Sequence, residues 1–187
     1  MVNIGSTDFY INVPSLPRQE FKKYSTLLFD DWEIYVESVL KLSDYSLSLN
    51  VEEGSIKAVG HVTTTLGVLI ISIGQYGSFV SGLQTIHSQI RSAGNYLGER
   101  AAAPFQYSNA QPKVRRRGES LVRLQNLFIK VQRGEITVQE AMRESEVILG
   151  SEAETSPEFM DKLKESLEQT PLLPQQMELP LVTKEGG

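Results

Sequence analysis

The sequence contains no cysteine among its 187 residues, and this absence removes several classes of site at once. Disulfide bonds, thiol nucleophiles and cysteine-based zinc or iron–sulfur sites are all excluded. A reducing cytoplasm is the simplest setting for such a chain, although an exported bacterial protein can also lack cysteine. The first residues contain no basic segment followed by an apolar run, so we expect no signal peptide.

Histidine is scarce as well, and the two that occur, His61 and His87, fall in different predicted elements. A catalytic base or metal ligand needs a companion placed beside it, so we interpret both as structural residues. The sequence has no Ser/His/Asp arrangement, no phosphate-binding glycine loop and no metal-ligand spacing. We therefore expect no catalytic residues, no metal and no cofactor, and a protein that is not an enzyme.

Charge is missing from a long central stretch, because no Asp, Glu, Lys or Arg occurs between Lys57 and Arg91. Apolar residues recur there at helical spacing, which predicts one helix over residues 64–98. Small residues interrupt it at positions that would let another backbone approach closely, and they are candidates for helix packing or self-association. They are Gly67, Gly74, Ser78 and Gly82.

Two roles for this predicted helix stay open. The favoured one is a core helix, buried against a sheet and against the helix predicted over 18–42. The other is membrane insertion, which needs about 20 predominantly apolar residues. The uncharged residues from Leu66 to Leu83 are borderline in both length and hydropathy.

The rest of the first 98 residues predicts a small α+β domain with the element order β-α-β-β-α and two long helices. Apolar residues alternate over residues 8–13, which indicates a strand. They recur every three or four residues from 18 to 42, which indicates an amphipathic helix. Two further alternating runs flank the Glu-Glu-Gly sequence at 52–54, which indicates a β-hairpin.

The remaining sequence predicts three more segments. Residues 99–118 contain two prolines and no periodicity, and we interpret them as a basic flexible linker. Residues 119–169 predict a helical hairpin and a short helix, with a stop at Gly134, a capping box from Thr137 to Glu140, and a start at Ser156–Pro157. Residues 170–187 are broken by prolines and are expected to be disordered.

Charge is unevenly divided among these parts. The net charge is −3 over residues 1–98, +6 over 99–133 and −8 over 134–187, within a total of −5. The basic stretch is a candidate for nucleic-acid phosphates, with salt-sensitive and sequence-independent affinity. Its alternative role is a solvated linker that neutralises the acidic C-terminal third. The candidate residues are Lys113, Arg115, Arg116, Arg117 and Arg123.

The tail contains Gln176-Met177-Glu178-Leu179-Pro180-Leu181. These six residues resemble the hexapeptide that binds the bacterial sliding clamp, Gln-Leu-x-Leu-Pro-Leu, with methionine in place of the first leucine. Methionine is similar in volume and can fill the same apolar hollow. The resemblance implies that Gln176 fixes the register, that Met177 is the first anchor, and that Leu179 and Leu181 fill a deeper pocket. Pro180 would pre-set an extended backbone, and Glu178 would face water.

These features favour a small bacterial, phage or mobile-element protein that is not an enzyme and that acts at replicating DNA. Its tail would dock on the sliding clamp, and its basic linker would add weak attraction to the DNA backbone. The alternative is a self-assembling or membrane-associating scaffold or effector that uses residues 64–98. A homo-oligomer or a subunit of a larger complex is expected in either case. No family is identified for residues 1–170.

Overall fold

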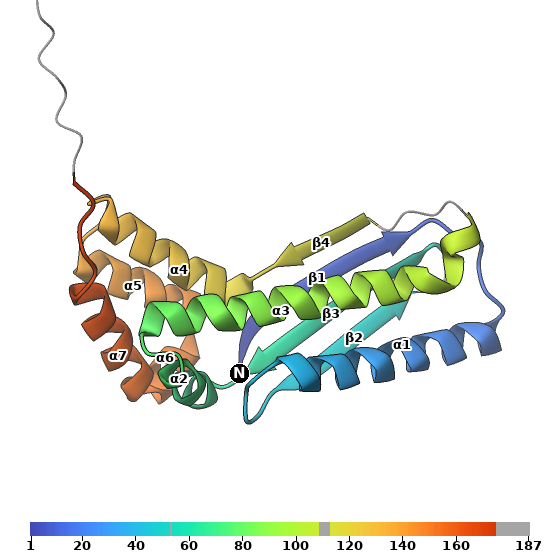
Figure 1. Cartoon of the computed structure of the whole chain (residues 1–187), viewed down its shortest axis with the longest axis horizontal. Coiled ribbons are helices and arrows are strands. Elements are labelled where there is room, and N and C mark those ends of the chain that lie inside the picture. Colours follow the sequence, from blue (N-terminus) through green and yellow to red (C-terminus); the bar gives the residue numbers. More distant parts are fainter. Residues whose placement is uncertain (53, 109–112, 175–187) are drawn as a thin grey trace, which may run out of the picture.

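The protein is described here by a computed structural model that covers residues 1–52, 54–108 and 113–174 (Figure 1). These residues form four strands, seven α-helices and one 3₁₀ helix, η1. Their bounds, in chain order, are β1 (Val2–Ile11), α1 (Arg18–Val39), β2 (Ser46–Glu52), β3 (Ile56–Thr64), α2 (Leu66–Gly74), α3 (Phe79–Ala102), η1 (Ala103–Ser108), β4 (Lys113–Arg117), α4 (Glu119–Gln132), α5 (Val138–Leu149), α6 (Ser151–Thr155) and α7 (Pro157–Glu168).

The four strands form one antiparallel sheet in the order β2-β3-β1-β4. The first strand lies between the third and the fourth, and helical segments follow β1 and β3 along the chain. This is the βαββαβ arrangement of ferredoxin-like folds. The predicted α+β class and the initial order β-α-β-β-α are confirmed, and the structure adds β4 at one edge of the sheet.

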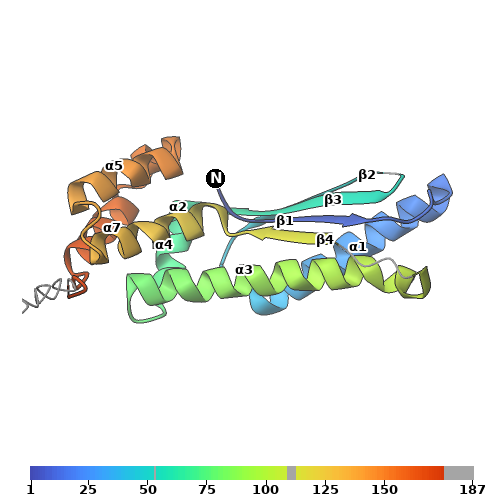
Figure 2. The same ribbon diagram turned by 90° about the horizontal axis from the view of Figure 1, so that it is seen from above.

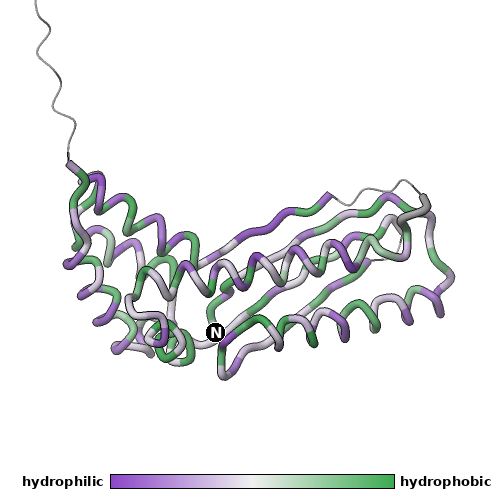
Figure 3. Tube along the Cα trace, in the orientation of Figure 1, coloured by the Kyte–Doolittle hydropathy of each residue, from purple (hydrophilic) through white to green (hydrophobic). Residues whose placement is uncertain are grey.

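The prediction of a flexible linker over residues 99–118 does not hold for its described residues. Residues 99–102 belong to α3, residues 103–108 form η1, and Lys113–Arg117 pair with β1 as the edge strand β4. The strand has a single apolar side chain, Val114, so it shows almost no alternation of apolar and polar residues. Figure 3 shows β4 as a strongly hydrophilic strand. Its pairing depends on backbone hydrogen bonds to β1, which no sequence pattern displays.

The single helix predicted over residues 64–98 is also corrected, because the chain breaks between α2 and α3. Gly77 has a φ of +80°, a conformation that favours glycine, and Ser78 caps α3 by accepting a hydrogen bond from the Ser81 N–H at 3.1 Å. No single helix in the described part of the chain is long and apolar enough to cross a membrane. Only the pair of α2 and α3, bent by 109°, meets that criterion together.

Helices α1 and α3 lie side by side on one face of the sheet (Figure 2). Trp32 of α1 is fully buried between them, and its indole N–H donates to the Ala93 carbonyl at 3.2 Å. Beneath this ring lies Gly60 of β3, where an added Cβ would stand 2.7 Å from a methyl group of Leu97. Both helices therefore pack on the sheet more closely than a side chain at this position would allow.

Small residues on α3 continue this close contact toward the edge of the sheet. A Cβ on Gly94 would lie 2.3 Å from the Thr7 hydroxyl of β1, and a Cβ on Gly98 would lie 2.9 Å from Val114 of β4. The helix thus contacts β1 and β4 directly. The sequence contains this glycine pair, but the small residues predicted to pack helices were Gly67, Gly74, Ser78 and Gly82, which lie in α2, at the break and in the first turn of α3.

The C-terminal helices pack against the first turns of α3 instead of forming a separate core. The Phe79 ring of α3 lies 6.0 Å from the Phe128 ring of α4 and 5.4 Å from the Phe159 ring of α7, measured between centroids. The predicted hairpin of α4 and α5 is present, with Gly134 at a φ of +67° and the capping box of Thr137 and Glu140 complete. One hydrophobic core therefore runs from the sheet into the helical end.

We expect Gly82→Ala to destabilise the fold, because a Cβ there would meet the Ile73 Cα and carbonyl oxygen at 2.8 Å. Overpacking against backbone should lower the free energy of unfolding by about 1–3 kcal/mol. Gly74→Ala is the matched control, since its Cβ would have no atom within 4 Å. Chemical denaturation should show unchanged or slightly raised stability for Gly74→Ala. Equal stability of the two variants would contradict the close contact of α2 with α3.

Candidate anion-binding site

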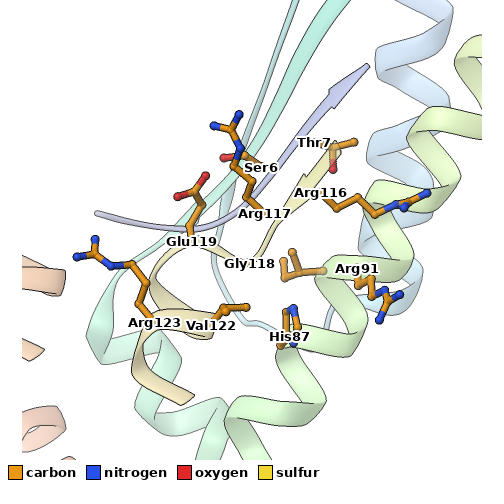
Figure 4. Close-up of a pocket in the computed structure, with 11 residues that line it drawn as sticks. Ser6, Thr7, His87, Arg91, Arg116, Arg117, Gly118, Glu119, Val122 and Arg123 are labelled. Atoms are coloured by element: carbon orange, nitrogen blue, oxygen red, sulfur yellow. The ribbon is translucent and has the colours of Figure 1, made fainter. Parts of the chain in front are cut away.

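A pocket of about 540 Å³ lies where α3, β1, β4 and the start of α4 meet (Figure 4). Among its described lining residues, four are arginines and one, Glu119, is acidic. The arginines come from three elements: Arg91 from α3, Arg116 and Arg117 from β4, and Arg123 from α4. Ser6 and Thr7 of β1 and His87 of α3 complete the polar lining.

Most of this positive charge has no acidic partner. Arg117 pairs with Asp8 of β1 at 2.9 Å. The side chains of Arg91, Arg116 and Arg123 form no ion pair or hydrogen bond with any residue of the described ranges. Guanidinium groups remain charged at all physiological pH values, so these side chains hold unneutralised charge around one hollow.

The close packing of α3 decides where two of these arginines lie. Gly94 of α3 has the Cγ atom of Arg116 as a neighbour, so the stem of Arg116 runs along the helix-covered side of β4. Arg91 stands three residues earlier on the same helix, about one turn away. Figure 4 shows Arg91 and Arg116 on one side of the pocket and Arg123 on the other.

His87 lies in the floor of the pocket, beside Gly118. A Cβ on Gly118 would stand 2.9 Å from the Cδ2 and Nε2 atoms of the imidazole, so only glycine lets the chain pass so close to the ring. Burial lowers the pKa of His87, and the positive charge of Arg91 lowers it further. In the free protein the ring is therefore held toward its neutral form.

Helix α4 begins at the same pocket. Gly118 precedes it and provides no side-chain cap, so the N–H groups of the first turn have no capping side chain. Glu119 has a φ of 40°, in the left-handed region that non-glycine residues rarely adopt. The helix then directs its positive end toward the hollow lined by the arginines.

The five residues predicted to bind nucleic acid lie in two different places in the structure. Arg116, Arg117 and Arg123 line the pocket. Lys113 and Arg115 lie with Asp8 along a second hollow of about 390 Å³, which also includes residues of β2 and β3. Sequence reasoning missed Arg91 and His87, which come from α3 and approach β4 only through tertiary packing.

The four small residues predicted to pack helices have separate local roles. Gly82 lets α3 approach the end of α2, and Ser78 caps α3. An added Cβ at Gly74 would meet no atom within 4 Å, and at Gly67 it would meet only the Thr65 hydroxyl, at 3.9 Å. These residues do not form one continuous face. The predicted clamp-binding residues, from Gln176 to Leu181, lie outside the described residues.

His61, the other histidine, belongs to a polar cluster on β1 and β3. Its Nδ1 atom lies 3.2 Å from Asn3 Nδ2 and 3.0 Å from Ser6 Oγ. The Asn3 side-chain oxygen also accepts from the Gly5 N–H at 3.1 Å, at the irregularity in the β1 register. The Ser6 residue is only 5% exposed, so the cluster ties the bulge of β1 to β3 and offers little access to a substrate.

We expect the pKa of His87, followed by NMR of its ring protons, to lie below the ordinary value of about 6.5. Arg91→Gln should raise this pKa, because it removes one positive charge beside the ring. It should not restore the ordinary value, because burial is the larger cause. A pKa at or above 6.5 in the parent protein would contradict the described environment.

Comparisons with known proteins give no relative for this chain. No protein-family model matches it, and no significant match occurs among curated proteins or solved structures.

Proposed function

We propose that this protein is a non-enzymatic interaction protein that acts at DNA in the cytoplasm, with a sliding clamp as its partner. The tail residues Gln176 to Leu181 dock on the clamp, and cations of β4 contact DNA phosphates. The observation that carries the proposal is the fixed row of Lys113, Arg115 and Arg117 on an ordered edge strand. An ordered row of cations binds phosphates at a lower entropic cost than a flexible linker does.

The row lies on the face of the sheet away from α1 and α3. Alternation along β4 puts Lys113, Arg115 and Arg117 on the face opposite Val114, which packs against α3. Neighbouring members of the row are about 6.8 Å apart along the strand. Lys57 of β3 lies two strands away in register with Lys113, with Tyr10 of β1 between them. The sheet thus presents a cationic edge suited to a polyanion.

The two contacts are joined by one rigid helix. Helix α4 starts directly after β4, and at its far end the Gln132 carbonyl accepts a hydrogen bond from the Leu173 N–H at 2.7 Å. The fourteen residues of α4 span about 21 Å. The hexapeptide begins two residues after Pro174, the last described residue before it. Binding at one end therefore raises the effective concentration of the other end at its own partner.

The C-terminal helices do not need the hexapeptide to complete their core. Phe159, Leu163 and Leu167 of α7 are buried against the rest of the chain. Leu172 and Leu173, which follow α7, are 70% and 55% exposed. The proposal assigns the apolar side chains of the hexapeptide to a partner groove.

Binding to purified sliding clamp, measured by calorimetry, should test the tail. Gln176→Ala combined with Leu179→Ala should abolish binding, because anchor residues of such peptides contribute about 2 kcal/mol or more each. Glu178→Ala is the matched control and should bind like the parent, since this position faces water. Unchanged binding by the double variant, or no binding by the parent, would refute clamp docking.

Lys113→Gln combined with Arg115→Gln should weaken binding to duplex DNA at every sequence. The slope of log K against log salt should fall by about 1 for each lost phosphate contact. Arg18→Gln, on α1 and outside both the row and the arginine-lined pocket, is the control and should retain the parent slope. An unchanged slope in the double variant would remove the β4 row from the DNA contact.

A further inference from the structure

We propose that the arginine-lined pocket binds a terminal phosphate, that is, a phosphate monoester of a nucleotide or of the 5′ end of a nucleic-acid strand. The site shares Arg117 with the cationic row of Lys113, Arg115 and Arg117, and its other arginines, Arg91, Arg116 and Arg123, lie outside that row. It stands on the geometry of the pocket and does not require clamp docking.

The charge around the pocket matches a dianion. The side chains of Arg91, Arg116 and Arg123 line the pocket without an acidic partner in the described residues, while Arg117 is already paired with Asp8. Glu119, at the start of α4, is the one acidic residue of the described lining, so four arginines still give the lining a net positive charge. A phosphate monoester carries a charge of about −1.5 to −2 at pH 7, whereas each diester in a continuous strand carries one. A terminal phosphate therefore neutralises this cluster better than an internal one.

The hydrogen-bond donors that line the pocket also suit a phosphate group. Guanidinium groups present two parallel N–H donors, which fit phosphate oxygens in a bidentate manner. The arginines belong to α3, β4 and α4, and Figure 4 shows their side chains directed away from one another. Binding of a phosphate in the hollow would therefore turn these long side chains inward from different directions. The uncapped first turn of α4 adds backbone N–H donors at the same hollow.

His87 and the Gly118 backbone line the pocket side by side, and Gly118 packs against the imidazole and against Val122. A phosphate bound in the pocket would therefore lie near the His87 ring, and the NMR signals of this ring should report its binding.

The experiment compares probes that differ only in a terminal phosphate, using the full chain. Adenosine 5′-monophosphate is compared with adenosine, and a 5′-phosphorylated single strand with its 5′-hydroxyl counterpart, by calorimetry and NMR. We expect the phosphorylated member of at least one pair to bind about tenfold more tightly or better and to shift the His87 ring signals. Preference in the nucleotide pair identifies a free nucleotide as the source, and preference in the strand pair alone identifies a strand end.

Arg116→Gln and Arg123→Gln should each reduce this preference about tenfold, whereas Arg18→Gln, on α1 and outside both the pocket and the β4 row, should leave it unchanged. Thermal melting provides the control for folding. Removing one of several mutually repelling cations should leave the melting temperature equal to the parent value or higher. A lost preference with an unchanged or raised melting temperature therefore assigns the effect to the site.

Two results would overturn the proposal. One is equal binding of phosphorylated and unphosphorylated probes in both pairs. The other is an equal loss of preference in Arg18→Gln and Arg116→Gln. Neither result bears on the DNA contact of the β4 row, which is read from the salt dependence of duplex binding by the Lys113 and Arg115 variants.

Discussion

The close contact of α3 with the sheet is the constraint on which the rest of the molecule depends. Gly94 and Gly98 of α3, and Gly60 beneath Trp32, remove the side chains that would hold helix and strands apart. Dispersion forces between the closely packed atoms then stabilise the packing of the helices on the sheet. The same contact brings Val114 of β4 under α3, so the edge strand is held by a helix as well as by its hydrogen bonds to β1.

This packing also produces an electrostatic cost. It brings Arg91 of α3 beside Arg116 of β4, while α4 adds Arg123 from the other side. Like charges around one hollow repel each other and weaken the folded state unless an anion offsets them. Elsewhere Arg100 pairs with Asp31 at 2.6 Å and Arg133 with Glu135 at 3.6 Å. The pocket differs in that three arginines with unpaired side chains line a single hollow.

Much of the architecture could be predicted from the sequence, and the failures have identifiable causes. The alternation in β2 and β3, the period of α1, and the capping box of α5 are local signals, and each led to the correct element. The break between α2 and α3 was missed because apolar spacing continues across Gly77 and Ser78. The strand β4 was missed because Val114 is its only apolar residue. Part of the pocket could be predicted, because Arg116, Arg117 and Arg123 are close in sequence. His87 and Arg91 join them only through tertiary packing.

The position of β4 at the edge of the sheet has a consequence for encounters between copies of this chain. A free edge offers unpaired backbone groups to any other strand, and sheets can extend from one molecule to the next in this way. Two β4 strands placed edge to edge would bring Lys113, Arg115, Arg116 and Arg117 of each copy against their equivalents. The repulsion between these positive charges disfavours pairing of two β4 strands. An assembly of copies of this protein is therefore expected to use another part of the surface.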